Sequence, residues 1–155
     1  MDFITTTDPA LVQKARTGKR IARAIAGGGS RFKHGITLTL SGVDCVVDKD
    51  NPSNDPCVVL KTMLNGQPFD SIHITTLVRP KLDGAGNELV PAGSFNQLAI
   101  GVVNGNPNAD DGTIADLIFS QVNGRQVRVK RDRGYTTMWS NGELHPAKLL
   151  EFDII

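Results

Sequence analysis

Several features that mark common protein classes are scarce in this chain. Of its 155 residues two are cysteine, and aromatic residues make up 5%. Two thiols do not make the framework of bridges that stabilises small secreted domains, so we expect Cys45 and Cys57 to be reduced structural thiols. A bridge between them across a hairpin is the alternative. No apolar run approaches the roughly 20 residues of a membrane-spanning helix, so we expect no membrane partner.

The first nine residues lack the pattern of a secretory signal. They include two acids where a signal has a positive start, and no apolar stretch follows them. The hydrophobic content of 39% is enough to bury an ordinary core, and the length fits one domain. We expect an intracellular location, in the cytoplasm or inside a host cell if the protein is viral.

Motifs of catalysis and of metal binding are also missing. The histidines at 34, 73 and 145 are far apart, and none stands at metal-ligand spacing from a cysteine. No serine lies in a nucleophile elbow, and no Gly-Lys-Ser/Thr follows the glycines at 27–29. We therefore expect no enzymatic activity, no metal and no cofactor.

What the chain does have is a sorting of its charges along the sequence. Residues 9–43 carry seven bases and no acid, residues 44–116 carry ten acids and four bases, and residues 125–133 carry five bases and one acid. The net charge of +1 hides these blocks. A polyanion would respond to the local blocks rather than to the average.

The first basic block predicts a helix. Asp8 can accept hydrogen bonds from free backbone amides, and Pro9 suits the first helical position. Weakly apolar residues then recur at steps of three and four as far as Ile25, with Gly18 in the middle, and the glycines at 27–29 end the pattern. We assign residues 1–30 to a basic N-terminal helix or arm, and residues 31–155 to a β-barrel domain.

The second part is typical of antiparallel strands. We expect strands at 35–40, 43–47, 57–64, 69–77 (with an irregularity between 69 and 72), 97–103, 127–130, 135–139 and 148–155. Asn65-Gly66 is a strong hairpin signal. Residues 113–122 fit either a helix that Gly124 ends or a hairpin at Asn123-Gly124, and we favour the helix. The expected fold is mainly β: a small antiparallel barrel with a basic N-terminal helix and one internal helix.

The second basic block predicts a binding surface. Arg128 and Lys130 alternate with Val127 and Val129, so the bases share the solvent face of a strand. If residues 131–134 form a turn, Tyr135 and Trp139 lie on the next strand beside them. Cations that follow phosphates, next to aromatics on which bases stack, suit the binding of single strands. The expected contacts are Arg128, Lys130, Arg131 and Arg133 with phosphates, Tyr135 and Trp139 with bases, and Lys19, Arg20 and Arg23 as additional electrostatic contacts. The simpler alternative is a core tryptophan and a solvated basic face.

The segments 35–40, 114–124, 127–133 and 135–139 together resemble the oligonucleotide-binding (OB) barrel: strands, a helix, then a basic and an aromatic strand. Among its members the chain looks most like the small single-stranded DNA-binding proteins of phages and bacteria. The resemblance implies an intracellular protein that coats single strands during replication or repair.

A second hypothesis is a self-assembling structural protein, such as a component of a virus particle. In this case the basic N-terminal arm would dock on the acidic central block of a neighbouring subunit. The expected partners are therefore single-stranded DNA or RNA, or further copies of this chain.

Overall fold

The computed structural model of the chain describes residues 3–19, 32–50, 56–78, 81–82, 88–89, 92–140 and 143–155. For residues 81–82, 88–89, 131–140 and 143–150 it describes the backbone alone. The strands are β1 (Phe3–Thr5), β2 (Thr37–Asp48), β3 (Cys57–Leu64), β4 (Gln67–His73), β5 (Lys81–Leu82), β6 (Glu88–Leu89), β7 (Gln126–Ser140) and β8 (Glu143–Ile154). The helices are α1 (Pro9–Thr17), α2 (Ile74–Val78), α3 (Ser94–Gly105) and α4 (Asp111–Val122).

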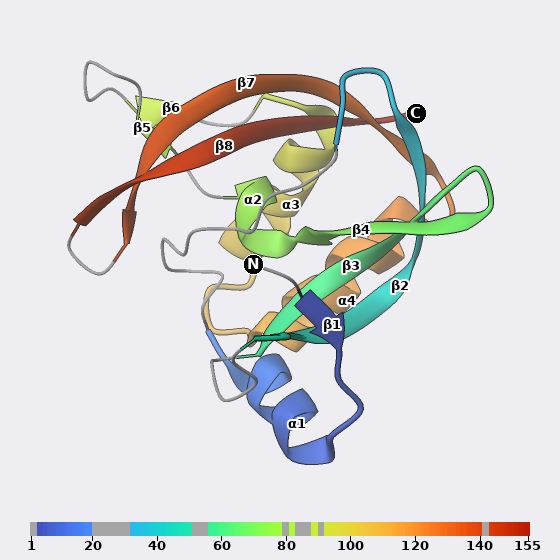
Figure 1. The fold of residues 1–155 in the computed structure, drawn as a ribbon, viewed down its shortest axis with the longest axis vertical. Helices are drawn as coiled ribbons and strands as arrows, with labels where there is room; N and C mark the ends of the chain where they lie inside the picture. The colour runs from blue at the N-terminus through green and yellow to red at the C-terminus, as the bar shows by residue number, and fades with distance from the viewer. Residues whose placement is uncertain are drawn as a thin grey trace.

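The strands form one antiparallel sheet, so the mainly β prediction is confirmed. The sheet order is β4-β3-β2-β7-β5-β6, with β1 beside β2 and β8 beside β7. In Figure 1 the long hairpin of β7 and β8 arches over α2 and α3, while α4 lies behind β2 and β3. No pairing in the described part of the chain joins β4 to β6, and the sheet is not closed. A barrel is therefore not confirmed.

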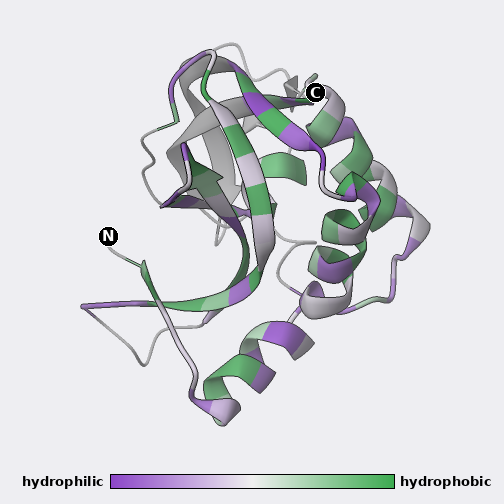
Figure 2. Cartoon of the chain, turned by 90° about the vertical axis from the view of Figure 1, so that its right-hand side faces the viewer, coloured by the Kyte–Doolittle hydropathy of each residue, from purple (hydrophilic) through white to green (hydrophobic). Residues whose placement is uncertain are grey.

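The helices and the sheet share one apolar core. Figure 2 shows the helices gathered on one side of the curved sheet. Four phenylalanines lie in a row through this core, with ring centroids 5.8 Å apart for Phe69 and Phe32, 5.5 Å for Phe32 and Phe152, and 6.3 Å for Phe152 and Phe95. They link β4, the segment before β2, β8 and α3. Edge-to-face and tilted ring contacts of this kind add to the free energy of apolar burial.

The open edge of β8 is covered by α3 instead of by another strand. The Phe152 amide donates to Oδ1 of Asn96 (2.7 Å), and the Ile154 amide donates to Oγ of Ser94 (2.8 Å). In return, the Ser94 amide donates to Oδ1 of Asp153 (3.0 Å). A Cβ atom at Gly93 would overlap the carbonyl oxygen of Phe152. Glycine is thus required where the chain enters α3, because the two backbones touch there.

Several elements lie where the sequence predicts them. β3 has the predicted bounds, and Asn65 and Gly66 adopt positive φ angles of 51° and 78°, as a tight hairpin turn needs. The predicted irregularity in β4 is present as a register shift opposite Leu60 and Thr62. Residues 111–122 form the helix rather than the hairpin, and left-handed Asn123 ends it.

Other expectations about single elements were wrong. Residues 97–103, predicted as a strand, belong to α3, because Phe95, Ala99 and Val102 recur at helical spacing and are all buried. Ile74 and Leu77, expected in the return strand, lie in α2. α1 begins at Pro9 as predicted, with Oδ1 of Asp8 accepting from the Ala10 amide (2.9 Å). It ends at Thr17 rather than at the glycines 27–29, which lie outside the described residues.

The two cysteines form no disulfide and lie on opposite faces of the sheet. Cys45 pairs with Val58 and Cys57 pairs with Val46, so the two residues are offset by one position. A one-residue offset turns a side chain to the other face. No bridge joins them, so the prediction that they are not disulfide-bonded is confirmed for this structure.

Replacing Asn96 by alanine tests the α3 contact with β8. The Asn96 side chain is fully buried, and its Nδ2 also donates to the Leu77 carbonyl (3.2 Å). Truncation leaves the Phe152 amide and the Leu77 carbonyl buried without these partners. We expect the free energy of unfolding to fall by about 2–4 kcal/mol in urea titrations. The control Asn104→Ala, on the exposed side of α3, should change it by no more than about 0.5 kcal/mol. Equal effects of the two substitutions would contradict this role of Asn96.

Candidate nucleic-acid interface

The first half of β7 presents the predicted basic residues to solvent. Val127 and Val129 are completely buried in the core, whereas Arg128 and Lys130 are exposed. This alternation confirms the sequence prediction for these four residues. We call the sheet surface that bears Arg128 the outer face, since the other face packs against the helices.

The acid paired with Arg128 in the sheet accepts a hydrogen bond from the start of α3. Arg128 is paired with Thr37 on β2 and with Asp153 on β8. Asp153 accepts from the Ser94 amide at the start of α3, where the N-cap Gly93 has no side chain to do so. Among the residues whose side chains the structure describes, no acid forms an ion pair with Arg128 or Lys130. Their charges are therefore directed to solvent.

A histidine that the sequence analysis did not connect with the basic strand lies beside it. Nδ1 of His34 is 2.6 Å from the carbonyl oxygen of Lys130, and the His34 side chain is exposed. The Gly35 amide also donates to the Val129 carbonyl (2.9 Å), so this segment runs alongside β7. Only the fold brings the two together, because they are far apart in sequence.

The second half of β7 differs from the prediction. Residues 131–134 do not turn the chain, so Tyr135 and Trp139 lie on the same strand as Arg128 rather than on the next one. The pairing with β8 continues past them to Ser140. Between 129 and 131, and again between 132 and 135, β7 has one residue more than β8, and the register shifts there. The side chains of Arg131, Arg133, Tyr135 and Trp139 lie outside the described part, so their expected contacts stay predictions.

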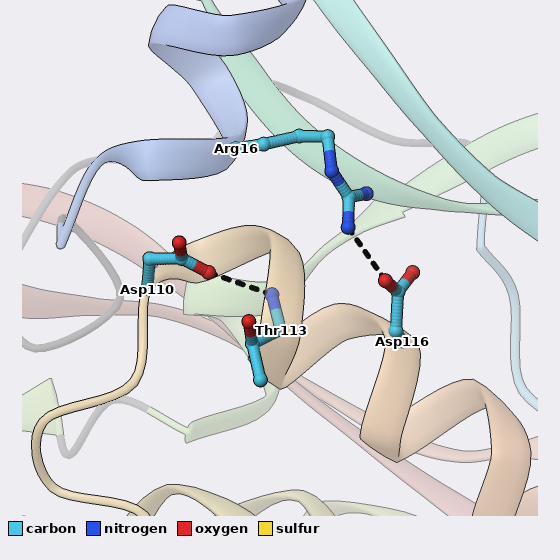
Figure 3. Close-up of polar contacts among 4 residues, drawn as sticks. All are labelled: Arg16, Asp110, Thr113 and Asp116. Atoms are coloured by element: carbon cyan, nitrogen blue, oxygen red, sulfur yellow. Dashed lines mark hydrogen bonds and ion pairs between the residues drawn. The ribbon is translucent and has the colours of Figure 1, made fainter.

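The N-terminal basic block is in part already paired within the chain. Nη2 of Arg16 is 2.5 Å from Oδ2 of Asp116 on α4, as Figure 3 shows. The Asp111 amide donates to the Gly18 carbonyl (2.8 Å), and Ala15 is buried in the common core. The hydrogen bond that Arg16 donates to the Asp116 carboxylate is the main reason why the pKa of Arg16 is raised.

The three bases predicted in that block are only partly described. Lys19 is exposed two residues after the end of α1. Arg20 and Arg23 lie outside the described residues, so an added electrostatic contribution from this segment stays a prediction.

The start of α4, which receives Arg16, is fixed by a side-chain cap. Oδ1 of Asp110 accepts from the Thr113 amide at 2.9 Å (Figure 3). This backbone hydrogen bond is the largest cause of the lowered pKa of Asp110. The carboxylate thus satisfies a free amide of the first turn and fixes where the helix begins. The helix itself is predicted from the sequence, whereas Asp110 is recognised as its cap only in the structure.

Burial shifts the pKa of two described groups that lie away from Arg128 and Lys130. Burial lowers the pKa of His73 to about 4, and the ring lies edge-on to Phe3 with centroids 4.7 Å apart. Burial is also the main cause of the raised pKa of Cys45. Within the described residues, no three His, Cys, Asp or Glu side chains come together as metal ligands would.

Comparison with known proteins gives no relative: no family model, no curated protein and no solved structure matches this chain. None of the described helices has the length and apolar character needed to cross a membrane. Function has to be argued from the chemistry of the outer face.

The burial of His73 predicts a pH-dependent stability. The unfolded chain binds a proton at His73 near the ordinary pKa of 6.5, whereas the folded chain does so only near 4. Stability is therefore unaffected above pH 6.5 and falls as the pH drops from 6.5 towards 4, by at most about 3 kcal/mol for this group. We expect His73→Phe to lose less free energy of unfolding than the parent between pH 7 and 4.5 in urea titrations. Identical losses would show that His73 does not contribute.

Proposed function

We propose that the protein binds single-stranded nucleic acid, DNA in the first instance, with little sequence preference on the outer face of the sheet. The observation that carries the proposal is the exposed pair Arg128 and Lys130, on a strand whose neighbouring acid, Asp153, is occupied by α3. Solvent-directed cations fixed on a sheet can follow a phosphate backbone, and such contacts need no particular base.

Two further exposed cations lie near the start of β7 or in the segment beside it. Arg125 is exposed just before β7, with its Nε donating to the terminal carbonyl of Ile155 (3.2 Å), and Lys33 is exposed in the segment that runs beside β7. We infer that Arg131 and Arg133 continue the phosphate contacts along β7. We infer that Tyr135 and Trp139, farther along β7 and beyond its two register shifts, supply the stacking contacts.

The resemblance to the OB barrel of small single-stranded DNA-binding proteins is part of this proposal and is not required by it. An open, curved sheet with one helix-covered face can present a strand-binding surface without closing. The intracellular location and a role in replication or repair belong to the same proposal.

The double variant Arg128→Gln/Lys130→Gln tests the proposed function. We measure the anisotropy of a fluorescein-labelled oligothymidylate at about 50 to 200 mM salt and follow the emission of Trp139, the only tryptophan. The parent should bind with a steep salt dependence, and the variant should bind more weakly. The slope of log K against log salt should be smaller by about 1.4, because about 0.7 is lost for each phosphate contact with a single strand.

The control variant is Lys14→Gln/Lys49→Gln, which removes the same charge at exposed positions away from the outer face of β7. It should keep the affinity and the slope of the parent. No binding by the parent at the lower salt would overturn the proposal, as would equal losses in the two variants. Quenching of Trp139 on binding would support its stacking role.

A second candidate function, self-assembly, is favoured by the contact between Arg16 and Asp116. This ion pair joins the basic N-terminal segment to the acidic central block, and the same contact made between two copies would link subunits.

Size-exclusion chromatography without nucleic acid separates the two functions. If binding is the function, we expect the elution volume to be the same at low and high salt. Oligomers that dissociate with salt and are absent in Asp116→Asn would instead favour assembly, because the variant removes the charge that pairs with Arg16. The same experiment with Asp50→Asn, an exposed acid in the turn after β2, is the control.

A further inference from the structure

The outer face contains a row of uncharged residues that crosses the strands. Thr39 on β2 is paired with Met63 on β3 and with Gln126 on β7, and Met63 is paired with Pro68 on β4. Directly paired residues of antiparallel strands lie on one face of the sheet. Nε2 of Gln126 donates to Oγ1 of Thr39 (3.3 Å), so two members of the row are also joined by their side chains. We call these four residues the uncharged row.

Cations lie on both sides of the uncharged row. Gly42 on β2 is paired with Lys61, and Thr37 on β2 is paired with Arg128. Thr39 therefore lies between the positions of the two cations along β2. Lys61 is exposed and is the only charged residue of β3. Its stem extends over Gly42, where a Cβ atom would be 4.0 Å from Cδ of Lys61. Lys61 and Arg128 therefore lie diagonally opposite each other across the sheet.

The size of this arrangement fits a short stretch of a single strand. With strands about 4.8 Å apart and residues about 3.3 Å apart along each strand, roughly 18 Å separates the Cα atoms of Lys61 and Arg128. The midpoint of this diagonal lies over Thr39. A polyanion that contacted the cations at both ends would pass over the uncharged row.

We propose that the bound strand crosses the outer face diagonally, from Arg128 and Lys130 on β7 to Lys61 on β3, with a base lying against Met63. This inference rests on the proposed function and adds to it the direction of the ligand and two further contact residues. Lys61 contacts a phosphate at the far end. Met63 is half-buried and presents a polarizable thioether, which makes favourable contacts with aromatic rings such as those of bases.

The uncharged centre also favours a single strand over a duplex. A duplex presents its phosphates outward and its bases only within grooves, so its bases cannot lie against the side chains of the uncharged row. In a single strand the bases are unpaired and can turn to lie on the sheet.

The test compares Lys61→Gln with Lys49→Gln, two single-charge removals at exposed lysines. Lys49 follows the end of β2 and is not on the diagonal. With the labelled oligothymidylate, Lys61→Gln should lower the slope of log K against log salt by about 0.7, and Lys49→Gln should leave it unchanged. Met63→Ala should weaken binding by about two- to tenfold, with little change in the slope, since it removes a contact without charge. Thermal melting confirms that each variant is folded.

The outcomes distinguish this inference from the proposed function. If Arg128→Gln/Lys130→Gln loses affinity while Lys61→Gln behaves like Lys49→Gln, the diagonal path is wrong and the function stands. If the parent does not bind, both are wrong. A duplex of the same length that competes as well as the single strand would also overturn the inference.

Discussion

The free edge of β8 is closed by the first turn of α3, and much of the architecture depends on this contact. An unpaired strand edge exposes amide and carbonyl groups that attract further strands. Here Ser94 and Asn96 accept from the outward amides of β8, and Gly93 allows the backbones to touch. The bond from Asn96 to Leu77 then fixes α2 against α3. At this edge α3 thus takes the place of a further strand.

The contact between α3 and β8 also determines which charges the outer face directs to solvent. Asp153 is the acid paired with Arg128 on β8, and its carboxylate serves as the missing cap of α3. One carboxylate therefore stabilises the helix and leaves the cation of the next strand directed to solvent. The structural contact and the candidate binding surface are coupled through this single residue.

Local signals in the sequence predicted well the elements that they determine. Asn65-Gly66 fixed a hairpin, and the alternation of Val127 to Lys130 identified both faces of β7. Residues 97–103 were misassigned because alternation and helical spacing overlap in short apolar segments, and the burial of Phe95 and Ala99 decides between them only in the fold. The helical cover on β8 and the position of Asn96 depend on contacts across more than 50 residues, which no local pattern contains.

The candidate site likewise contains residues that local sequence predicts and residues that only the fold brings together. The exposed pair on β7 could be predicted, whereas Thr39, Met63 and Lys61 join it only through strand pairing, although a single lysine in the otherwise uncharged β3 was a usable signal. The charge blocks overstated the free positive charge, because Arg16 is neutralised by an acid of the same chain.

The offset of the two cysteines gives the sheet two chemically distinct sides. Cys45 is buried under the helices, whereas Cys57, one strand away, belongs to the face that bears Lys61 and Met63. A thiol-reactive dye would therefore modify Cys57 well before Cys45, whose thiolate is disfavoured by burial. The native sequence thus carries a single attachment point for a spectroscopic reporter on the outer face, with no need for an introduced cysteine.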